Sequence, residues 1–316
     1  MNMLKTEKDI FLDGKRFIYI KDRLAGGSVF VSQDRSEYLR TSTKEEIEGE
    51  VNLTKDLYNR KFPVPLILKT GILENGINYY IEKSIGDRVF GDIFKEETRS
   101  FNYVNDESFN MFIEIIKKYC EVQFNKKNFV PHNINSLDEV ISISNVMKNN
   151  EPSYKIKESF IRAYEKAKQR VMSLPWGYIQ PDLNAFNILP NGIIDFELSG
   201  FGPVGYDVLT NIYFNRMWPS EKIAYIFTDN QIIKYIKEVD KIAIKKGLPL
   251  ISQYIDDFLV LKTIWGTAKD KESENNPQSN LDFWNWRVKI RDWSIHQYLN
   301  WKNIDTSQFE KIGTSI

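Results

Sequence analysis

Three polar residues between positions 177 and 208 have the types and the spacing that phosphoryl transfer requires. Asp182 and Asn187 stand five apart in a polar loop, and Asp195 follows two short apolar runs that are separated by the turn 190–192. The turn predicts a hairpin that places Asp195 opposite Asn187, where a carboxylate and an amide can bind one Mg²⁺ ion. Asp182 remains available to orient or deprotonate an acceptor hydroxyl.

This segment resembles the catalytic segment of the aminoglycoside phosphotransferase and choline kinase-like family, which reads roughly His-x-Asp-x-x-x-x-Asn, followed by Ile-Asp-Phe/Tyr-Glu. Asp182, Asn187 and residues 194–197 match it, whereas Gln180 stands where the family has His and the hairpin is shorter than the family's. A Gln amide can share the scaffolding hydrogen bonds of that His. The resemblance implies a protein-kinase-like fold, Mg²⁺, and ATP or GTP as co-substrate. The alternative is a polar loop and a surface hairpin that meet these spacings by chance.

The first eighty residues predict a strand-rich lobe with one helix. The helix is expected over 44–59, ahead of the Pro-Val-Pro sequence at 63–65, and Asn75-Gly76 predicts a type I′ hairpin turn. Five β-rich runs are parted by turn residues: 17–20, 28–32, 38–41, 67–73 and 77–81. Five strands and a helix resemble the amino-terminal lobe of a kinase.

Beyond Gly86 the apolar pattern becomes helical, interrupted only by the hairpin around Asp195. Helices are expected over 109–124, 153–172, 206–215, 231–246, 252–268 and 281–301. The sequence therefore predicts a two-lobed α+β protein. Residues 1–84 would form a nucleotide-binding lobe, and residues 85–316 would form a helical lobe with the catalytic loop and the acceptor site.

A glycine-rich turn at Leu24-Ala25-Gly26-Gly27-Ser28 occupies the place of the family's turn over the nucleotide phosphates. Glycine lets backbone amides approach an anion closely, so Gly26, Gly27 and Ser28 are expected to contact phosphate. The alternative is an ordinary Gly-Gly hairpin turn.

The resemblance supplies four further nucleotide-binding residues. Arg40 would hold the α- and β-phosphates, with Lys44 as a competing candidate, and Glu50 on the following helix would be the carboxylate partner of the cation. Ordinary exposed charges are the alternative for each. Glu82 and Ser84 lie at the expected hinge between the lobes, where backbone groups would bind a purine edge.

Two acidic residues near the metal site have supporting roles. Glu197 could bind the ion directly or through water, or it could cap a turn. Asp207 resembles the family's Asp that opens a helix and braces the catalytic loop. The two histidines, His132 and His296, are isolated in the sequence and do not suggest a zinc site.

The acceptor is expected to be a small cationic hydroxyl compound, aminoglycoside-like or an amino alcohol such as choline. Asp256, Asp257 and Trp265 are the candidate acceptor residues, and the acids Glu272 and Glu274 would extend the negative field. Core packing of the carboxy-terminal aromatics is the alternative reading. A sugar or nucleoside acceptor, a protein kinase with one partner, and a nucleotide-binding regulatory or scaffold protein without turnover are the alternative functions.

Composition excludes several other classes of function. The chain has 43 basic and 43 acidic residues, so no net charge attracts it to nucleic acid or to an anionic membrane. Its single cysteine, Cys120, permits no intramolecular disulfide. No run of apolar residues approaches the length of a membrane span. These features predict a cytoplasmic protein.

Overall fold

The computed structural model describes residues 9–23, 26–149, 158–196, 198–219, 224–268 and 277–314. The described residues pack as two units. One comprises those in Met1–Phe90 and Asn187–Glu197, and the other comprises those in Gly91–Phe186 and Leu198–Ile316. Asn187 and Asp195 therefore belong to the first unit, whereas Asp182 belongs to the second.

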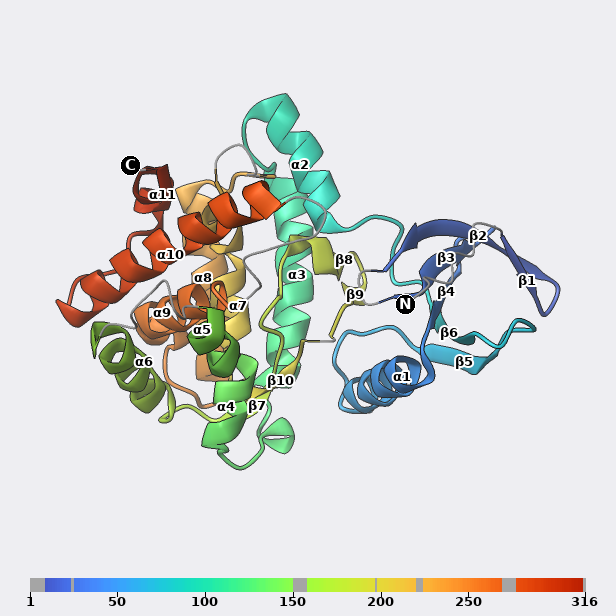
Figure 1. Cartoon of the computed structure of the whole chain (residues 1–316), viewed down its shortest axis with the longest axis horizontal. Coiled ribbons are helices and arrows are strands. Elements are labelled where there is room, and N and C mark those ends of the chain that lie inside the picture. Colours follow the sequence, from blue (N-terminus) through green and yellow to red (C-terminus); the bar gives the residue numbers. More distant parts are fainter. Residues whose placement is uncertain are drawn as a thin grey trace. The chain divides into compact units, whose positions relative to one another are not determined.

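The first unit is built on a six-stranded antiparallel sheet with the strand order β1-β2-β3-β4-β6-β5 (Figure 1). Helix α1 connects β4 to the β5–β6 hairpin, and because that hairpin returns beside the meander, β6 pairs with β4. The bounds are β1 Ile10–Leu12, β2 Lys15–Asp22, β3 Ser28–Ser32, β4 Glu37–Ser42, α1 Lys44–Asn59, β5 Ile67–Ile72 and β6 Asn78–Lys83.

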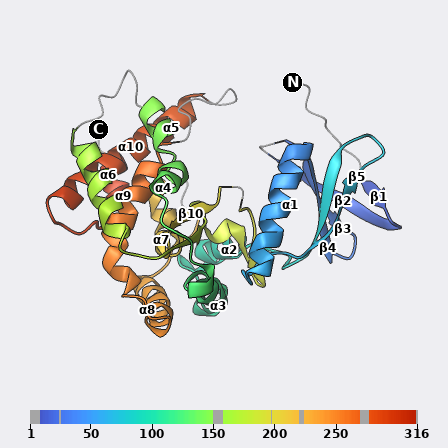
Figure 2. The ribbon, with the colours of Figure 1, turned by 90° about the horizontal axis from the view of Figure 1, so that it is seen from below.

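The two faces of this sheet bury different sets of side chains, because successive strand residues point to opposite faces. Tyr79 and Ile81 of β6 pack in a cluster with Phe17, Phe30 and Leu39. Tyr80, between them in sequence, belongs to a second cluster with Ile47 and Val51 of α1. Helix α1 therefore covers the face of the sheet that carries the even-numbered residues of β6 (Figure 2).

A short hairpin of β8 (Ile188–Leu189) and β9 (Gly192–Ile193) belongs to the first unit. The Ile193 N–H donates to the Pro63 carbonyl oxygen at 2.7 Å, and the Asn191 N–H donates to the Ile85 carbonyl oxygen at 3.0 Å. A Cβ atom at Gly192 would lie 2.5 Å from the Pro63 oxygen, so this close approach requires glycine. These contacts anchor the expected hairpin to the strand-rich unit.

The second unit is mainly helical, with one two-stranded sheet of β7 and β10 (Figure 1). Helix α9 is buried on all sides and packs against α6, α7 and α10. The bounds are α2 Phe90–Phe101, α3 Asp106–Gln123, α4 Ile134–Val140, α5 Ile143–Asn149, α6 Glu158–Val171, β7 Trp176–Ile179, β10 Gly200–Pro203, α7 Tyr206–Asn211, α8 Asp229–Lys245, α9 Ile255–Trp265, α10 Pro277–Leu299 and α11 Phe309–Thr314. Short 3₁₀ turns are η1 Lys126–Asn128, η2 Ala185–Asn187, η3 Phe214–Met217, η5 Ile251–Tyr254 and η6 Thr306–Gln308.

Several elements differ from the sequence predictions. Strand β1 was not predicted, although the Asp13-Gly14 turn that joins it to β2 has positive φ at both residues, which a type I′ hairpin requires. Helices α2, α4, α5 and α11 and the β7–β10 pair were also missed. The predicted helix over 252–268 is shorter, because a 3₁₀ turn precedes α9. Among the described helices, none combines the length and the hydropathy needed to cross a membrane.

Candidate active site

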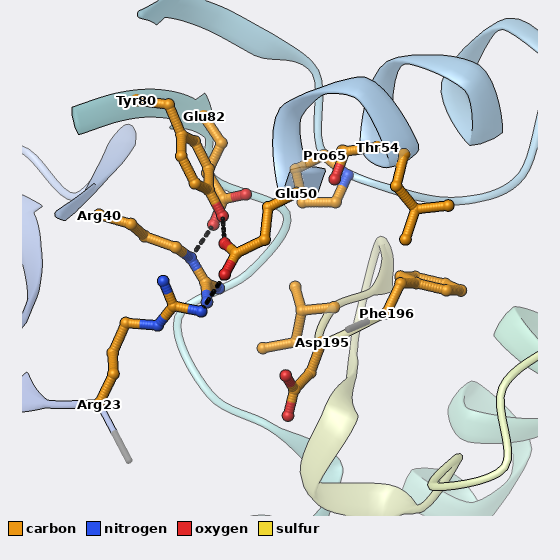
Figure 3. A pocket seen from close by; sticks show the side chains of 11 residues that line it. Arg23, Arg40, Glu50, Thr54, Pro65, Tyr80, Glu82, Asp195 and Phe196 are labelled. Carbon is orange, nitrogen blue, oxygen red and sulfur yellow. Dashed lines mark hydrogen bonds and ion pairs between the residues drawn. The ribbon is translucent and has the colours of Figure 1, made fainter. Parts of the chain in front are cut away.

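A pocket of the first unit lies between α1 and the sheet face that α1 covers; we call it the sheet-face pocket. Residues of β4, β6 and α1 line it together with the segment after β9 (Figure 3). Because Arg40 pairs with Tyr80 across β4 and β6, and Glu82 is two residues from Tyr80, these three side chains share one face. The lining residues are Arg23, Arg40, Glu50, Leu53, Thr54, Pro65, Tyr80, Glu82, Ile194, Asp195 and Phe196.

The charges in the sheet-face pocket pair differently from the prediction. The resemblance implied Glu50 as the partner of Arg40, but the Arg40 Nε atom donates to Glu82 Oε1 at 2.9 Å. Glu50 instead accepts a hydrogen bond from the Tyr80 hydroxyl at 2.8 Å and forms an ion pair with Arg23 (Figure 3). The reason is the register of β4 and β6, which places Glu82 diagonally opposite Arg40. Arg23, at the end of β2, was not predicted.

These interactions keep Arg40 charged inside the fold. Burial by itself would lower the pKa of Arg40, but Glu82, Tyr80 and Glu50 together outweigh burial and raise the pKa above its usual range. Burial raises the pKa of the Tyr80 hydroxyl well above its usual value, so Tyr80 stays neutral and donates a hydrogen bond to the Glu50 carboxylate. The pocket is therefore lined by two cations, Arg23 and Arg40, each of which forms an ion pair with a carboxylate.

The glycine-rich turn divides into residues with different roles. Gly26 and Gly27 have φ angles of +103° and +76°, and a Cβ atom at Gly27 would lie 1.8 Å from the Thr41 carbonyl oxygen. Ser28 is fully buried: its N–H donates to Thr41 Oγ1 and its hydroxyl donates to Asp22 Oδ1, both at 2.9 Å. Both donors of Ser28 are therefore already used within the sheet, and contact with phosphate, which would require one of these bonds to open, stays a prediction. Leu24 and Ala25 lie outside the described residues.

The expected hinge residues have partners inside the first unit. The Glu82 carboxylate binds Arg40. The Ser84 N–H donates to the Ser36 carbonyl oxygen, and the Lys83 N–H donates to the Leu66 carbonyl oxygen, both at 2.9 Å. A purine edge could therefore use these N–H groups only after their bonds opened. Purine recognition by the backbone at Glu82 and Ser84 stays a prediction.

The β8–β9 hairpin places the backbones of the two predicted metal ligands near each other, on either side of the end opposite its turn. The Ile194 N–H donates to the Asn187 carbonyl oxygen at 2.9 Å, and Asp195 is the next residue in the segment that follows β9. Asp195 is exposed at the sheet-face pocket and has a φ of +68°, a left-handed conformation that Asp tolerates better than most residues. Glu197 lies outside the described residues.

The donor set fits a magnesium site of the kind that nucleotide substrates complete. The described residues contain no group of three His, Cys, Asp or Glu side chains placed to hold a metal ion. Mg²⁺ typically takes one or two protein oxygen ligands and fills its remaining positions with water and phosphate. One amide and one carboxylate, from Asn187 and Asp195, suit that arrangement.

In the second unit, the loop that carries Asp182 is held by main-chain contacts. The Leu183 N–H donates to the Gln180 carbonyl oxygen at 2.9 Å, and the Asn184 amide donates to the Asp182 carbonyl oxygen at 2.7 Å. The Lys262 ammonium, from α9, donates to the Pro181 carbonyl oxygen. The half-buried Asp182 side chain is therefore presented by a loop whose backbone is fixed on both sides.

Asp207 braces this loop, as the resemblance implied. Its fully buried carboxylate accepts from the Gln180 N–H at 2.8 Å, the Tyr119 hydroxyl at 2.6 Å and the Gln123 amide at 2.9 Å. Burial raises the pKa of Asp207, while the hydrogen bonds of Gln123 and Tyr119 oppose that rise. The Gln123 amide also donates to the Tyr178 carbonyl oxygen at 2.9 Å. Gln123 was not predicted, since a Gln on a helix gives no sequence signal for this role.

Gln180→His is expected to retain phosphoryl transfer and thermal stability. The Gln180 N–H bond to Asp207 does not depend on the side chain, and an imidazole can offer one donor and one acceptor as an amide does. Gln180→Ala is the matched control, and we expect a lower Tm because it leaves a cavity at a fully buried position. Measurements of kcat and Tm check this; loss of activity in a stable Gln180→His variant would give Gln180 a role of its own.

The structure corrects the predicted acceptor role of Asp257. Its side chain is 2% exposed, and both oxygens lie 2.9 Å from Arg170 Nε of α6. The Tyr298 hydroxyl of α10 also donates to it. The adjacent Asp256 accepts from the Ile304 N–H at 2.9 Å. Asp257 therefore joins three helices, because the predicted helix is buried on all sides and has no solvent face.

Trp265, the third predicted acceptor residue, lines a cavity of the second unit; we call it the α9–α10 cavity. The Lys262 ammonium lies 4.0 Å from the centroid of the Trp265 ring, and Arg287 of α10 is another lining residue. Two cations thus stand where acids were expected. Glu272 and Glu274 lie outside the described residues.

Asp257→Ala is expected to lower the free energy of unfolding by about 2–3 kcal/mol, because a buried carboxylate with charged and hydroxyl partners is lost. Arg170 is half-exposed and can be hydrated in the variant, which limits the loss. Asp229→Ala, whose side chain is 89% exposed beside Arg216, is the control and should change stability little. Urea unfolding of both variants checks this. If Asp257→Ala were as stable as the wild-type protein, Asp257 would contribute nothing to the packing of these helices.

Comparison with known proteins gives a fold assignment. No protein-family model matches the chain, and no curated protein matches it by sequence. A solved structure from Ralstonia eutropha JMP134, described as a candidate aminoglycoside phosphotransferase, is similar with a TM-score of 0.58 and 13% identity over 92% of this chain and 94% of that one. The GDP complex of aminoglycoside 2'-phosphotransferase-IIIa is similar with a TM-score of 0.53 and 11% identity over 89% and 92% of the two chains.

A third similar solved structure contains two bound ligands. It is a thermostable mutant of aminoglycoside phosphotransferase APH(4)-Ia in a ternary complex with AMP-PNP and hygromycin B. Its TM-score is 0.54 and its identity 10%, over 89% of this chain and 93% of that one. The expected α+β class is confirmed, with its strand-rich and helical lobes. The chain has the protein-kinase-like fold of the aminoglycoside phosphotransferases.

Proposed function

We propose that the protein is a small-molecule kinase that transfers the γ-phosphate of ATP or GTP to a hydroxyl group. One observation carries the proposal: the hairpin brings Asp195 to the same pocket as Arg40 and Arg23. A carboxylate that suits Mg²⁺ and two cations that suit phosphate oxygens thus line one cavity. The nucleotides in the similar structures, GDP and AMP-PNP, support the same use of this fold.

The proposed reaction is a direct, in-line transfer. The acceptor oxygen attacks the γ-phosphorus and gives its proton to Asp182, while the bond from the γ-phosphorus to the β-bridging oxygen breaks and the nucleoside diphosphate leaves. Arg40 and Arg23 bind the phosphates, and Glu82 and Glu50 keep these cations in place. Bound by Asn187 and Asp195, Mg²⁺ would neutralise phosphate charge. No covalent enzyme intermediate is required.

The cytoplasm, where ATP and GTP are available, is the proposed place of action. The acceptor is proposed to be a small molecule, as hygromycin B is in the similar ternary complex. The structure does not favour a cationic acceptor. The acid that best supported a positive charge, Asp257, is buried in an ion pair of its own.

The test is a screen of alcohol acceptors with purified protein, Mg²⁺ and either ATP or GTP. We expect one acceptor class to gain a phosphoryl group, detected by mass, with equal formation of nucleoside diphosphate. Reactions without Mg²⁺ and reactions with Asp182→Asn are the controls. Failure to bind either nucleotide would refute the proposal. Tight binding without transfer to any acceptor would instead support a regulatory nucleotide-binding protein.

A further inference from the structure

The α9–α10 cavity is formed within the second unit beside the catalytic loop. Its walls come from η3, α9 and α10, and they include the rings of Phe214, Trp218 and Trp265. Two cations also line it, Lys262 and Arg287, and no carboxylate is among the described residues that line it. The cavity is therefore positive and aromatic, although the chain as a whole carries no net charge.

Both cations have backbone carbonyl and aromatic contacts that orient them. The Lys262 side chain is buried, and its ammonium donates to the Pro181 carbonyl oxygen and lies over the Trp265 ring. The Arg287 guanidinium donates to the Gly266 carbonyl oxygen at 3.2 Å and lies 3.8 Å from the centroid of the Phe283 ring. Carbonyl and aromatic contacts orient a cation, but the charge remains to attract an anion.

The position of Arg287 links the cavity to Asp182. Burial lowers the pKa of Arg287 to about 10, and the charge of Asp182 opposes this fall. Lys262 provides a second link, because it holds Pro181, the residue before Asp182. A molecule in the cavity would therefore lie beside the residue that is proposed to take the proton from the acceptor hydroxyl.

We propose that the α9–α10 cavity binds a carboxylate group of the acceptor through Arg287 and Lys262, with the acceptor hydroxyl directed toward Asp182. The cavity volume, about 30 Å³, suits a group as small as a carboxylate. A planar guanidinium binds a carboxylate through paired hydrogen bonds, and the aromatic rings would pack against its carbon skeleton. The proposal rests on the proposed function, since it names the class of acceptor: a hydroxy acid.

The first test compares hydroxy acids with uncharged analogues of the same shape in the presence of Mg²⁺ and nucleotide. The pairs are 4-(hydroxymethyl)benzoate with 4-(hydroxymethyl)benzamide, and glycerate with glyceramide. We expect kcat/KM to favour each acid about 10- to 100-fold, the value of a charge-assisted hydrogen bond. Preference for the uncharged partner, or for cationic amino alcohols and aminoglycosides, would overturn the proposal.

The second test changes the charge at position 287. Arg287→Met should abolish the preference for acids, whereas Arg287→Lys should keep most of it, and neither should change Mg²⁺-nucleotide affinity. Lys262→Met provides a second removal of charge, at a position where loop support would also be lost. If Arg287→Met kept the acid preference while lowering kcat for all acceptors equally, Arg287 would act on Asp182 and the carboxylate site would be refuted.

A binding measurement makes the result independent of turnover. Benzoate should raise the Tm of the wild-type protein more than benzamide at the same concentration, and Arg287→Met should remove that difference. Equal shifts for the two probes would overturn the carboxylate site even if transfer occurred. Absence of nucleotide binding together with a benzoate-specific shift would refute the kinase function while leaving the anion site supported.

Discussion

Asp182→Asn is expected to lower kcat by about 10²- to 10⁴-fold and to leave the Kd of Mg²⁺-nucleotide nearly unchanged. The substitution keeps the size of the side chain and removes only its ability to accept a proton. The loop should persist, because the bond from Asn184 goes to the Asp182 carbonyl oxygen and the bond from Lys262 goes to Pro181. Single-turnover rates and nucleotide titrations measure the two effects separately.

Asp229→Asn is the matched control, since it removes one exposed carboxylate from the same unit. It should leave kcat and Kd at their wild-type values. Turnover by Asp182→Asn within threefold of the wild-type rate would remove Asp182 from its proposed role as base.

Asp195→Asn is expected to weaken Mg²⁺-dependent nucleotide binding by about 10- to 100-fold. Asn is chosen because the φ of Asp195 is +68°, and Asn tolerates this left-handed conformation while Ala does not. Asp195→Asn should therefore lose affinity at an unchanged Tm, whereas Asp195→Ala should lose affinity and Tm together. Calorimetric titration with Mg²⁺-nucleotide and thermal unfolding check both variants.

Asp13→Asn is the matched control for loss of an acidic residue, because Asp13 is an exposed carboxylate of the first unit that pairs with Lys69 and also has a positive φ, +51°. It should bind nucleotide as the wild type does. An Asp195→Asn protein with wild-type affinity would show that the metal site lies elsewhere.

The sequence by itself determined the features that depend on residues close together in the chain. Helix α1 has the predicted bounds, Lys44–Asn59, because the cap residue Thr43 and the following apolar spacing are local signals. The β8–β9 hairpin follows from a turn between apolar pairs, and it fixes the register of Asn187 and Asp195. The spacing of Asp182 and Asn187 was likewise readable without a fold.

The tertiary structure decided which charged residues meet. Glu50 and Glu82 were both named from the sequence, yet Arg40 binds Glu82, because β6 returns beside β4 after α1 and the β5–β6 turn. Arg23, which binds Glu50, lies 27 positions before it in the chain. Many pairings of these charges satisfy the sequence equally well, since strand register over such separations is set by the packing of the whole sheet.

The tertiary structure also determined which way the polar side chains of α9 point. Asp257 and Lys262 are both buried on this helix, which packs against α6, α7 and α10. A helix with one apolar face reveals from its sequence which residues point to solvent, but a helix that is apolar on all sides does not. Only the neighbouring helices determine that Asp257 meets Arg170 while Lys262 lies beside the catalytic loop at Pro181.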